Sequence, residues 1–168
     1  ALDFDGVNDQ VVVTGNTILS PTKITLETWM YAKNFNSSPC ADCAPIIWHQ
    51  GKGYRFGTGN TGGLNIQFFD GSSTITLTSA STLSKNAWHH LAVTYDSAMI
   101  KLYIDGACTD SMSKVFSLSY SSKGADVWVV DPATGYGGTL EETRIWNYAR
   151  SFKEIREGMV KSHKSGTK

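Results

Sequence analysis

The stretch AWHHLAVTYDSAMIKLYIDG, residues 87–106, is the clearest indicator of fold in this sequence. Two runs rich in β-branched and aromatic residues flank a polar turn around residues 96–98, and Asp105-Gly106 closes the second run. Such side chains favour strands, and Asp-Gly favours a tight turn. The stretch therefore predicts a hairpin of two antiparallel strands.

A second strand signal is KITLETWMYAK, residues 23–33, in which side-chain character alternates. Successive side chains on a strand point to opposite faces. One face would carry Ile24, Leu26, Thr28 and Met30, and the other Glu27, Trp29 and Tyr31.

Other short runs between turn signals predict strands at residues 10–15, 46–50, 54–59, 64–71, 74–79, 125–131 and 138–149. Only residues 151–163 have helical spacing, with Ser151 as a candidate N-cap. About ten short strands with almost no helix predict an all-β antiparallel sandwich or barrel. We expect one domain over residues 1–162, followed by a flexible polar tail at 163–168.

Composition narrows the function classes. The 168 residues fit one domain, and 15 Lys plus Arg balance 15 Asp plus Glu. Neutrality argues against a nucleic-acid partner or an anionic membrane surface. The chain has no apolar run of the roughly 20 residues that a membrane span needs, so we expect no membrane insertion. No signal peptide opens the sequence, which is consistent with a cleaved leader or a position inside a larger protein.

The cysteines leave three interpretations open. Cys40 and Cys43 could close a short loop, or one of them could pair with Cys108. All three could be free thiols, or Cys40, Cys43 and His49 could hold zinc with a fourth ligand that the spacing does not supply. The sequon at residues 36–38 favours a secreted or cell-surface, extracellular protein.

Four segments in order resemble the laminin-G-like, concanavalin A-like lectin/glucanase superfamily. They are ALDFDGVNDQVVV, ITLETWMY, NAWHHLAVTYDSAMIKLYIDG and GTLEETRIWNYARSFKEI. The resemblance implies a jelly-roll sandwich of two sheets with a short C-terminal helix. Thr143 stands where an apolar residue is usual and Glu141 where Asp is more common. The fold hosts lectins, glycosidases, lyases and adhesion domains, so it does not decide function.

Catalysis finds little support. The related β-glucanases carry three acids at alternate positions of one strand, and no Glu-x-Asp-x-Glu string exists here. Glu141 and Glu142 are adjacent, so on a regular strand they point to opposite faces. His89 and His90 follow Trp88 in a predicted strand, where one would face the core and the other outward.

A structural Ca²⁺ is a second expectation. The opening turn offers oxygen ligands of the kind that Ca²⁺ prefers, from Asp3, Asp5, Asn8 and Asp9. The resemblance adds Glu141, because related sandwiches often bridge their first and last strands with Ca²⁺. The alternative is a solvated turn with hydrogen-bonding Asp side chains. Glu27 and Arg144 are expected to form an ion pair between neighbouring strands.

A sugar site needs aromatic platforms beside polar groups that read hydroxyls. Two turn-rich segments supply such groups, and the candidate ligand-binding residues are Trp48, His49, Tyr54, Arg55, Asn60, Asp131 and Tyr136. The other tryptophans are expected to lie mainly in the core.

The sequence therefore favours a non-catalytic, lectin-like carbohydrate-binding module, part of a larger extracellular protein. The alternative is a protein-interaction or assembly domain of an extracellular or surface structure. A diverged glycoside hydrolase or polysaccharide lyase is the weakest interpretation. The expected partner is a glycan or an extracellular protein.

Overall fold

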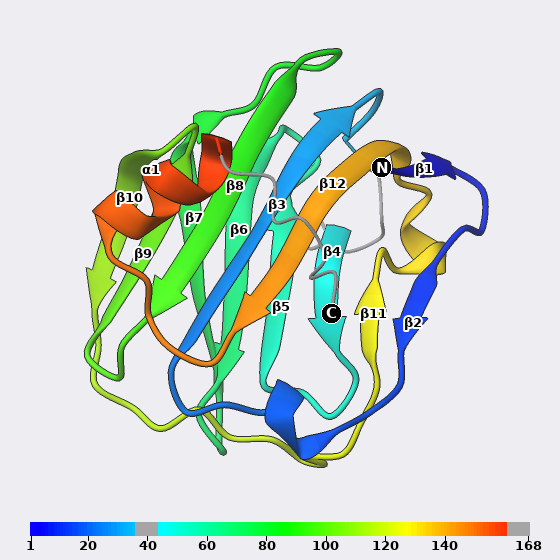
Figure 1. Cartoon of the computed structure of the whole chain (residues 1–168). Coiled ribbons are helices and arrows are strands. Elements are labelled where there is room, and N and C mark those ends of the chain that lie inside the picture. Colours follow the sequence, from blue (N-terminus) through cyan, green and yellow to red (C-terminus); the bar gives the residue numbers. More distant parts are fainter. Residues whose placement is uncertain (36–43, 161–168) are drawn as a thin grey trace, which may run out of the picture.

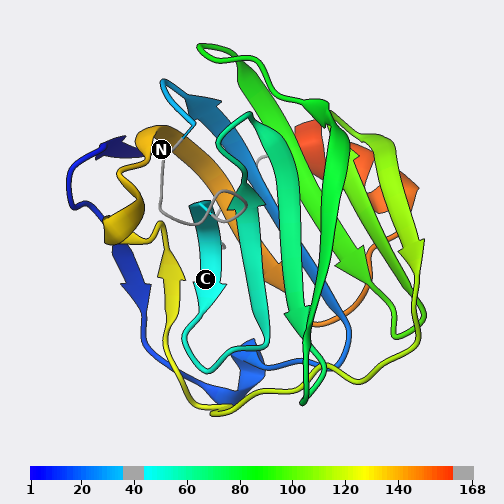
Figure 2. The same ribbon diagram turned by 180° about the vertical axis from the view of Figure 1, so that it is seen from behind.

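The computed structural model describes residues 1–35 and 44–160, which form two six-stranded sheets packed face to face (Figures 1 and 2). Sheet A has the strand order β1 (Leu2–Asp5), β12 (Gly137–Trp146), β3 (Ile24–Ala32), β8 (Trp88–Tyr95), β9 (Met99–Ile104), β10 (Ala107–Ser113). Sheet B has the order β2 (Val11–Val13), β11 (Val127–Val129), β4 (Ala44–His49), β5 (Tyr54–Thr58), β6 (Gly63–Phe69), β7 (Thr74–Thr82). The predicted all-β antiparallel sandwich is confirmed.

The predicted hairpin is strands β8 and β9, which pair from Leu91–Ile104 to Tyr95–Ile100. Asp96 shapes its turn, because Oδ1 accepts hydrogen bonds from the backbone N–H groups of Ala98 and Met99 at 2.9 and 2.8 Å. The neighbouring edge strand β10 was not predicted, because its residues ACTDSMS lack the apolar alternation of a half-buried strand.

Side chains from the facing sides of both sheets form one core between the layers. On β3 the predicted alternation holds, since Ile24, Leu26 and Met30 are all buried there. Thr28 shares that face, and its Oγ1 lies 2.9 Å from Oγ1 of Thr143. The unusual Thr143 therefore has a polar partner across the strand pair.

The first and last strands meet in sheet A, where Leu2 lies opposite Leu140 and Asp5 opposite Gly137. The chain then leaves β12 and forms helix α1 (Phe152–Val160), which lies across the outer face of sheet A (Figure 1). Ser151 caps this helix together with Glu154, whose Oε2 accepts the Ser151 N–H at 2.7 Å, and the predicted N-cap is confirmed.

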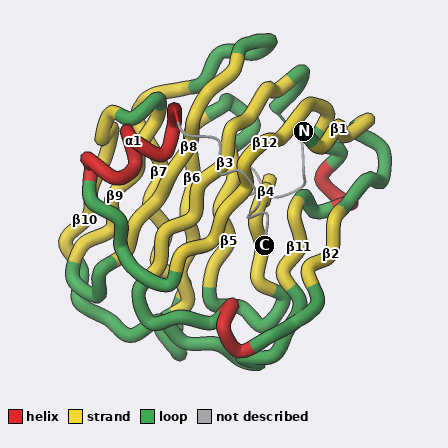
Figure 3. The backbone as a smooth tube through the Cα atoms, viewed as in Figure 1, coloured by secondary structure: helices red, strands yellow, loops and turns green. Residues whose placement is uncertain are grey.

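Apart from α1, helical structure in the described residues is limited to two 3₁₀ turns, η1 (Thr17–Leu19) and η2 (Pro132–Thr134) (Figure 3). Within residues 1–35 and 44–160, no helix has the length and apolar character that crossing a membrane requires. The sequon, Cys40, Cys43 and the tail at 163–168 lie outside the described residues, so their predicted roles stay predictions.

Candidate functional site

A straight row of side chains crosses the outer face of sheet B. The strand register places one residue from each strand in this row: Val12, Trp128, Trp48, Arg55, Gln67 and Thr76. Residues directly opposite on paired strands share one face, so all six side chains point the same way. The row combines two indole rings with polar groups, as a sugar platform requires.

The aromatic part of the row is built by Trp48 and Trp128. Their ring centres lie 5.5 Å apart with an interplanar angle of 73°. Arg55 lies over Trp48, with its Cζ 4.3 Å from the ring centre. This contact positions the guanidinium group, whose N–H bonds lie in the guanidinium plane and point away from its rim.

A pocket of about 220 Å³ opens beside this row. Its lining includes Trp48, Gln50, Lys52, Arg55 and Gln67, and the Lys52 ammonium lies 4.6 Å from the ring centre of Phe69. The charged side chains of the lining are Lys52 and Arg55, both cationic. We call this the Trp48–Arg55 pocket.

Two nitrogen atoms of this lining are buried without a hydrogen-bond partner among the described residues. They are Nε of Arg55 and Nε2 of Gln50. Burial lowers the pKa of the Arg55 guanidinium, and the carboxylate of Asp131 opposes that effect. The described part of the chain therefore leaves two donors beside the pocket unused.

Two predicted ligand residues, Trp48 and Arg55, are thus brought together. Tyr54 also belongs to the pocket lining, but it is buried, as is His49, and both have their polar atoms bonded inside the protein. His49 Nε2 lies 3.0 Å from Ser20 Oγ, and the Tyr54 hydroxyl donates to the Leu19 carbonyl at 3.0 Å. Burial lowers the pKa of His49 and raises the pKa of Tyr54. Both residues therefore act in the core.

The structure does not bring the remaining three candidates to the pocket surface. Asn60 is exposed in the turn between β5 and β6. Asp131 is buried and caps η2, where its carboxylate accepts the Ala133 N–H at 3.0 Å. Its negative charge acts on the Arg55 guanidinium through electrostatic attraction. Tyr136 is buried and donates to the Tyr31 carbonyl at 3.1 Å.

Sequence reasoning did not select four members of the site: Trp128, Gln50, Lys52 and Gln67. Alternation in residues 125–131 placed Trp128 on one face of a strand, but only the pairing of β11 with β4 puts it beside Trp48. Register between distant strands was the missing information.

The acids proposed for Ca²⁺ lie mostly in one turn. Asp5 Oδ1 accepts the Val7 N–H at 2.8 Å, and Asp9 Oδ2 accepts the Asp5 N–H at 2.8 Å. Asp3 accepts the hydroxyl of Thr139 at 2.8 Å, and Asn8 is exposed. The three Asp side chains thus make the hydrogen bonds that the alternative interpretation expects.

Glu141 is separated from that turn. Asp5 lies opposite Gly137, so Glu141 is four positions further along β12, roughly 13 Å away. Its carboxylate lies 4.0 Å from the Ala1 amine. Among the described residues, no three His, Cys, Asp or Glu side chains converge as metal ligands. A Ca²⁺ ion at the turn would therefore depend on Asn8, backbone carbonyls and water as well as Asp5 and Asp9.

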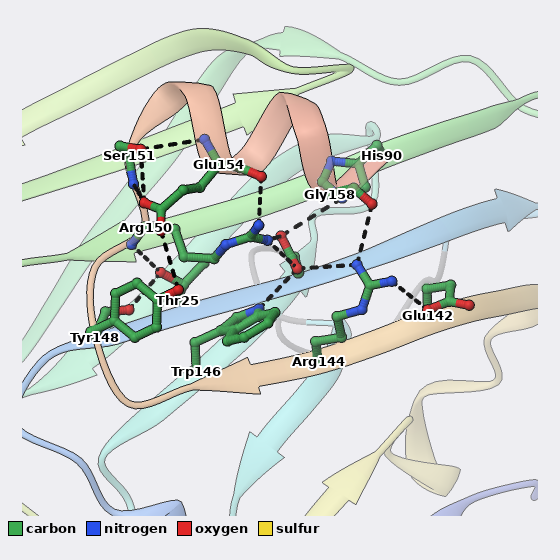
Figure 4. A network of polar contacts seen from close by, with 11 residues as sticks. Thr25, His90, Glu142, Arg144, Trp146, Tyr148, Arg150, Ser151, Glu154 and Gly158 are labelled. Carbon is green, nitrogen blue, oxygen red and sulfur yellow. Dashed lines mark hydrogen bonds and ion pairs between the residues drawn. The ribbon is translucent and has the colours of Figure 1, made fainter. Parts of the chain in front are cut away.

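Figure 4 shows a network of polar contacts beneath α1 that includes Arg144, Trp146 and Arg150. Their common partner is Glu27, which forms ion pairs with both arginines. The predicted ion pair with Arg144 is confirmed at 3.3 Å. Arg150 contacts both Glu27 oxygens at 2.6 and 2.8 Å, and Trp146 Nε1 donates to Oε1 at 2.9 Å. His90 lies 3.9 Å from the same carboxylate. Glu27 is fully buried and fully engaged, so it joins strands to helix and is not available to a substrate.

A second polar arrangement connects the segment before β8, β8 itself and the β9–β10 turn. Ser84 Oγ lies 2.8 Å from His89 Nε2, and His89 Nδ1 lies 2.8 Å from Asp105 Oδ2. The order of groups matches a serine hydrolase triad. Asp105 is 48% exposed, however, and its other oxygen accepts the His90 N–H at 2.9 Å. This chain of contacts fastens the β9–β10 turn to β8.

Comparison with known proteins places the chain among sandwich domains. A family model described as the concanavalin A-like lectin/glucanases superfamily matches residues 5–156. Mouse (Mus musculus) pappalysin-1 is 25% identical over 179 residues, covering 95% of this chain but 11% of pappalysin-1. The chain thus corresponds to a small part of that relative.

Solved structures with the same fold have low sequence identity. The CBM40 of the Ruminococcus gnavus IT-sialidase, bound to α2,3 sialyllactose, has a TM-score of 0.69 and 12% identity, with 93% of this chain and 94% of that one covered. The binding domain of Paraclostridial Mosquitocidal Protein 1 has a TM-score of 0.69 and 16% identity, covering 90% and 41%. The SAP-like pentraxin of Limulus polyphemus has 0.65 and 13%, covering 92% and 78%.

Proposed function

This chain belongs to the concanavalin A-like lectin/glucanase superfamily, and on that premise we propose that it is a non-catalytic, lectin-like carbohydrate-binding module of a larger extracellular protein. The observation that supports this most is the row of Trp128, Trp48 and Arg55 across the outer face of sheet B. The apolar part of a sugar would pack against the indole pair, and the polar groups beside it would bind the sugar hydroxyls.

The lack of carboxylates in the Trp48–Arg55 pocket supports a non-catalytic role for that pocket. Hydrolysis of a glycosidic bond generally needs two carboxyl groups on either side of the bond. The lining of the Trp48–Arg55 pocket, which lies entirely in described residues, contains neither Asp nor Glu. Glu27, the fully buried acid of β3, belongs to sheet A and forms ion pairs with Arg144 and Arg150.

A protein partner is the second candidate function, and a different surface favours it. A pocket on the outer face of sheet A is lined by Trp29, Trp88 and Met159, together with Glu141 and Glu142. The expectation that these two glutamates point to opposite faces was wrong, because β12 has a register shift between Glu141 and Arg144 and is not a regular strand there. Trp88 is 43% exposed there. Exposed aromatic and Met side chains are typical of protein interfaces.

A matched pair of variants separates the two functions. We expect Trp48→Ala to lower binding on a glycan array by about tenfold or more, because it removes both an apolar contact surface and the ring that positions Arg55. Trp88→Ala removes the same side chain from the opposite outer face and should leave glycan binding unchanged. Binding to no glycan, or equal loss in both variants, would reject the sugar site, and a binding protein lost only with Trp88→Ala would favour the second function.

A further inference from the structure

We propose that the Trp48–Arg55 pocket selects anionic saccharides, which carry a carboxylate or sulfate group. This inference depends on the proposed glycan-binding function and adds the chemical class of the ligand. It follows from the charges of the lining, from two buried donors without partners and from the position of Arg55 against Trp48.

The charges around the pocket are unbalanced. Lys52 and Arg55 both carry positive charge at neutral pH, and no acid lines the cavity. Asp131 is the acid that acts electrostatically on Arg55, but it is buried and already caps η2. The chain as a whole has no net charge, so this local excess is a property of the pocket and not of the protein surface in general.

Two donors in the pocket lining have no acceptor in the described part of the chain. Arg55 Nε and Gln50 Nε2 are buried and have no partner among the described residues. Partly desolvated cations are costly unless an anion or acceptor compensates them. A carboxylate or sulfate offers several acceptor oxygens on one small group, whereas a sugar hydroxyl offers one.

The stacking of Arg55 fixes where that anion would sit. The guanidinium lies over the Trp48 ring at 4.3 Å, so its face is occupied and its N–H edge remains for hydrogen bonds. Arginine binds planar anions through two parallel N–H donors of this edge. Trp128, packed at 5.5 Å from Trp48, would support the apolar part of the same sugar.

The test is an NMR titration of the ¹⁵N-labelled chain with matched saccharides. The probes are 3′-sialyllactose, its uncharged methyl ester, 3′-sulfated lactose and lactose, with hexasaccharides of hyaluronan and heparin as polymeric acids and cellohexaose as their neutral counterpart. We expect at least one acidic probe to bind about tenfold or more tightly than its neutral counterpart, as a charge-assisted contact predicts. The carboxylate and sulfate arms then identify which anion is preferred.

Two arginine variants localise the effect. Arg55→Gln should remove the preference for the acidic probe, and Arg55→Lys should restore part of it as a point charge. Arg156→Gln removes the same charge from α1, on the other outer face, and should change nothing. Circular dichroism and melting curves establish that each variant is folded.

Glycan binding and the selection of anionic saccharides can be rejected separately. If neutral and acidic probes bind equally and Arg55→Gln leaves both unchanged, charge selection is overturned while sugar binding stands. If no saccharide in the panel shifts any resonance, the glycan-binding function falls and charge selection falls with it.

Discussion

Arg150 and Glu27, 123 residues apart in the sequence, form a hydrogen-bonded ion pair of 2.6 Å beneath helix α1. The pair joins the strand at the middle of sheet A to the segment that follows β12. Because Glu27 is fully buried, its negative charge depends on Arg150, Arg144 and Trp146 for compensation. The network therefore stabilises the closing segment without forming a reaction site.

Loss of this pair should be costly. Arg150→Met leaves a buried carboxylate with fewer partners, and we expect the free energy of unfolding to fall by about 3–5 kcal/mol. Urea denaturation followed by tryptophan fluorescence measures it. Lys153→Met is the control, because Lys153 pairs with Glu157 on the exposed face of α1 and should have no measurable effect. Similar stability in both variants would mean that the buried pair contributes little.

Stability should also depend on pH through His90. Burial lowers its pKa to about 4, with Glu27 opposing that shift and Arg144 and Arg150 adding to it. The unfolded chain takes up this proton near pH 6.5 and the folded chain only near pH 4, so stability falls as the pH drops through that window. The lowered pKa of buried His49 acts in the same direction.

The loss, at most a few kcal/mol, is measured by urea denaturation at pH 7, 6 and 5. His90→Gln removes one of the two contributions and should flatten the pH dependence. An unchanged slope in that variant would assign the effect to other groups.

Calcium remains a prediction for the opening turn. If Ca²⁺ binds there, it stabilises the folded state by about 2.7 kcal/mol at a hundredfold excess over Kd, and a chelator lowers the melting temperature. Asp5→Asn with Asp9→Asn should abolish the response, whereas Glu141→Gln should leave it intact, since Glu141 lies apart from the turn. A melting temperature that changes with neither calcium nor chelator would reject the proposed Ca²⁺ site.

The polar chain of Ser84, His89 and Asp105 provides a direct test of the non-catalytic proposal. Its carboxylate is about half exposed, so water weakens the stabilisation that a protonated imidazole would need. We expect no covalent labelling of Ser84 by a fluorophosphonate probe, in either the native chain or an Asp105→Asn variant. Labelling seen by mass spectrometry in the native chain alone would show an activated serine and overturn that proposal.

Much of the fold could be predicted because alternation is a local signal. The hairpin at residues 87–106, the faces of β3 and the Ser151 cap depend on residues close in sequence. The polar edge strand β10 lacked such a signal.

The site depended on information that alternation does not contain. Arg55 and Trp48 belong to predicted neighbouring runs, but Trp128 reaches them only through the pairing of β11 with β4. His49 and Tyr54 have the chemistry of ligand residues, yet they face the core, because a strand sends every second residue inward. The ion pair of Glu27 with Arg144 was predicted from the strand pattern. The pair with Arg150 was not, because Arg150 lies beyond the strand, in the turn before α1.

The row on sheet B runs at right angles to its strands, one residue from each of six. With about 4.8 Å between neighbouring strands, it extends roughly 24 Å, several sugar units and more than the single pocket occupies. A linear polysaccharide bound along the row would contact side chains that repeat at the spacing of the strands. Affinity would then rise with the degree of polymerisation until the oligomer outgrew the width of the sheet.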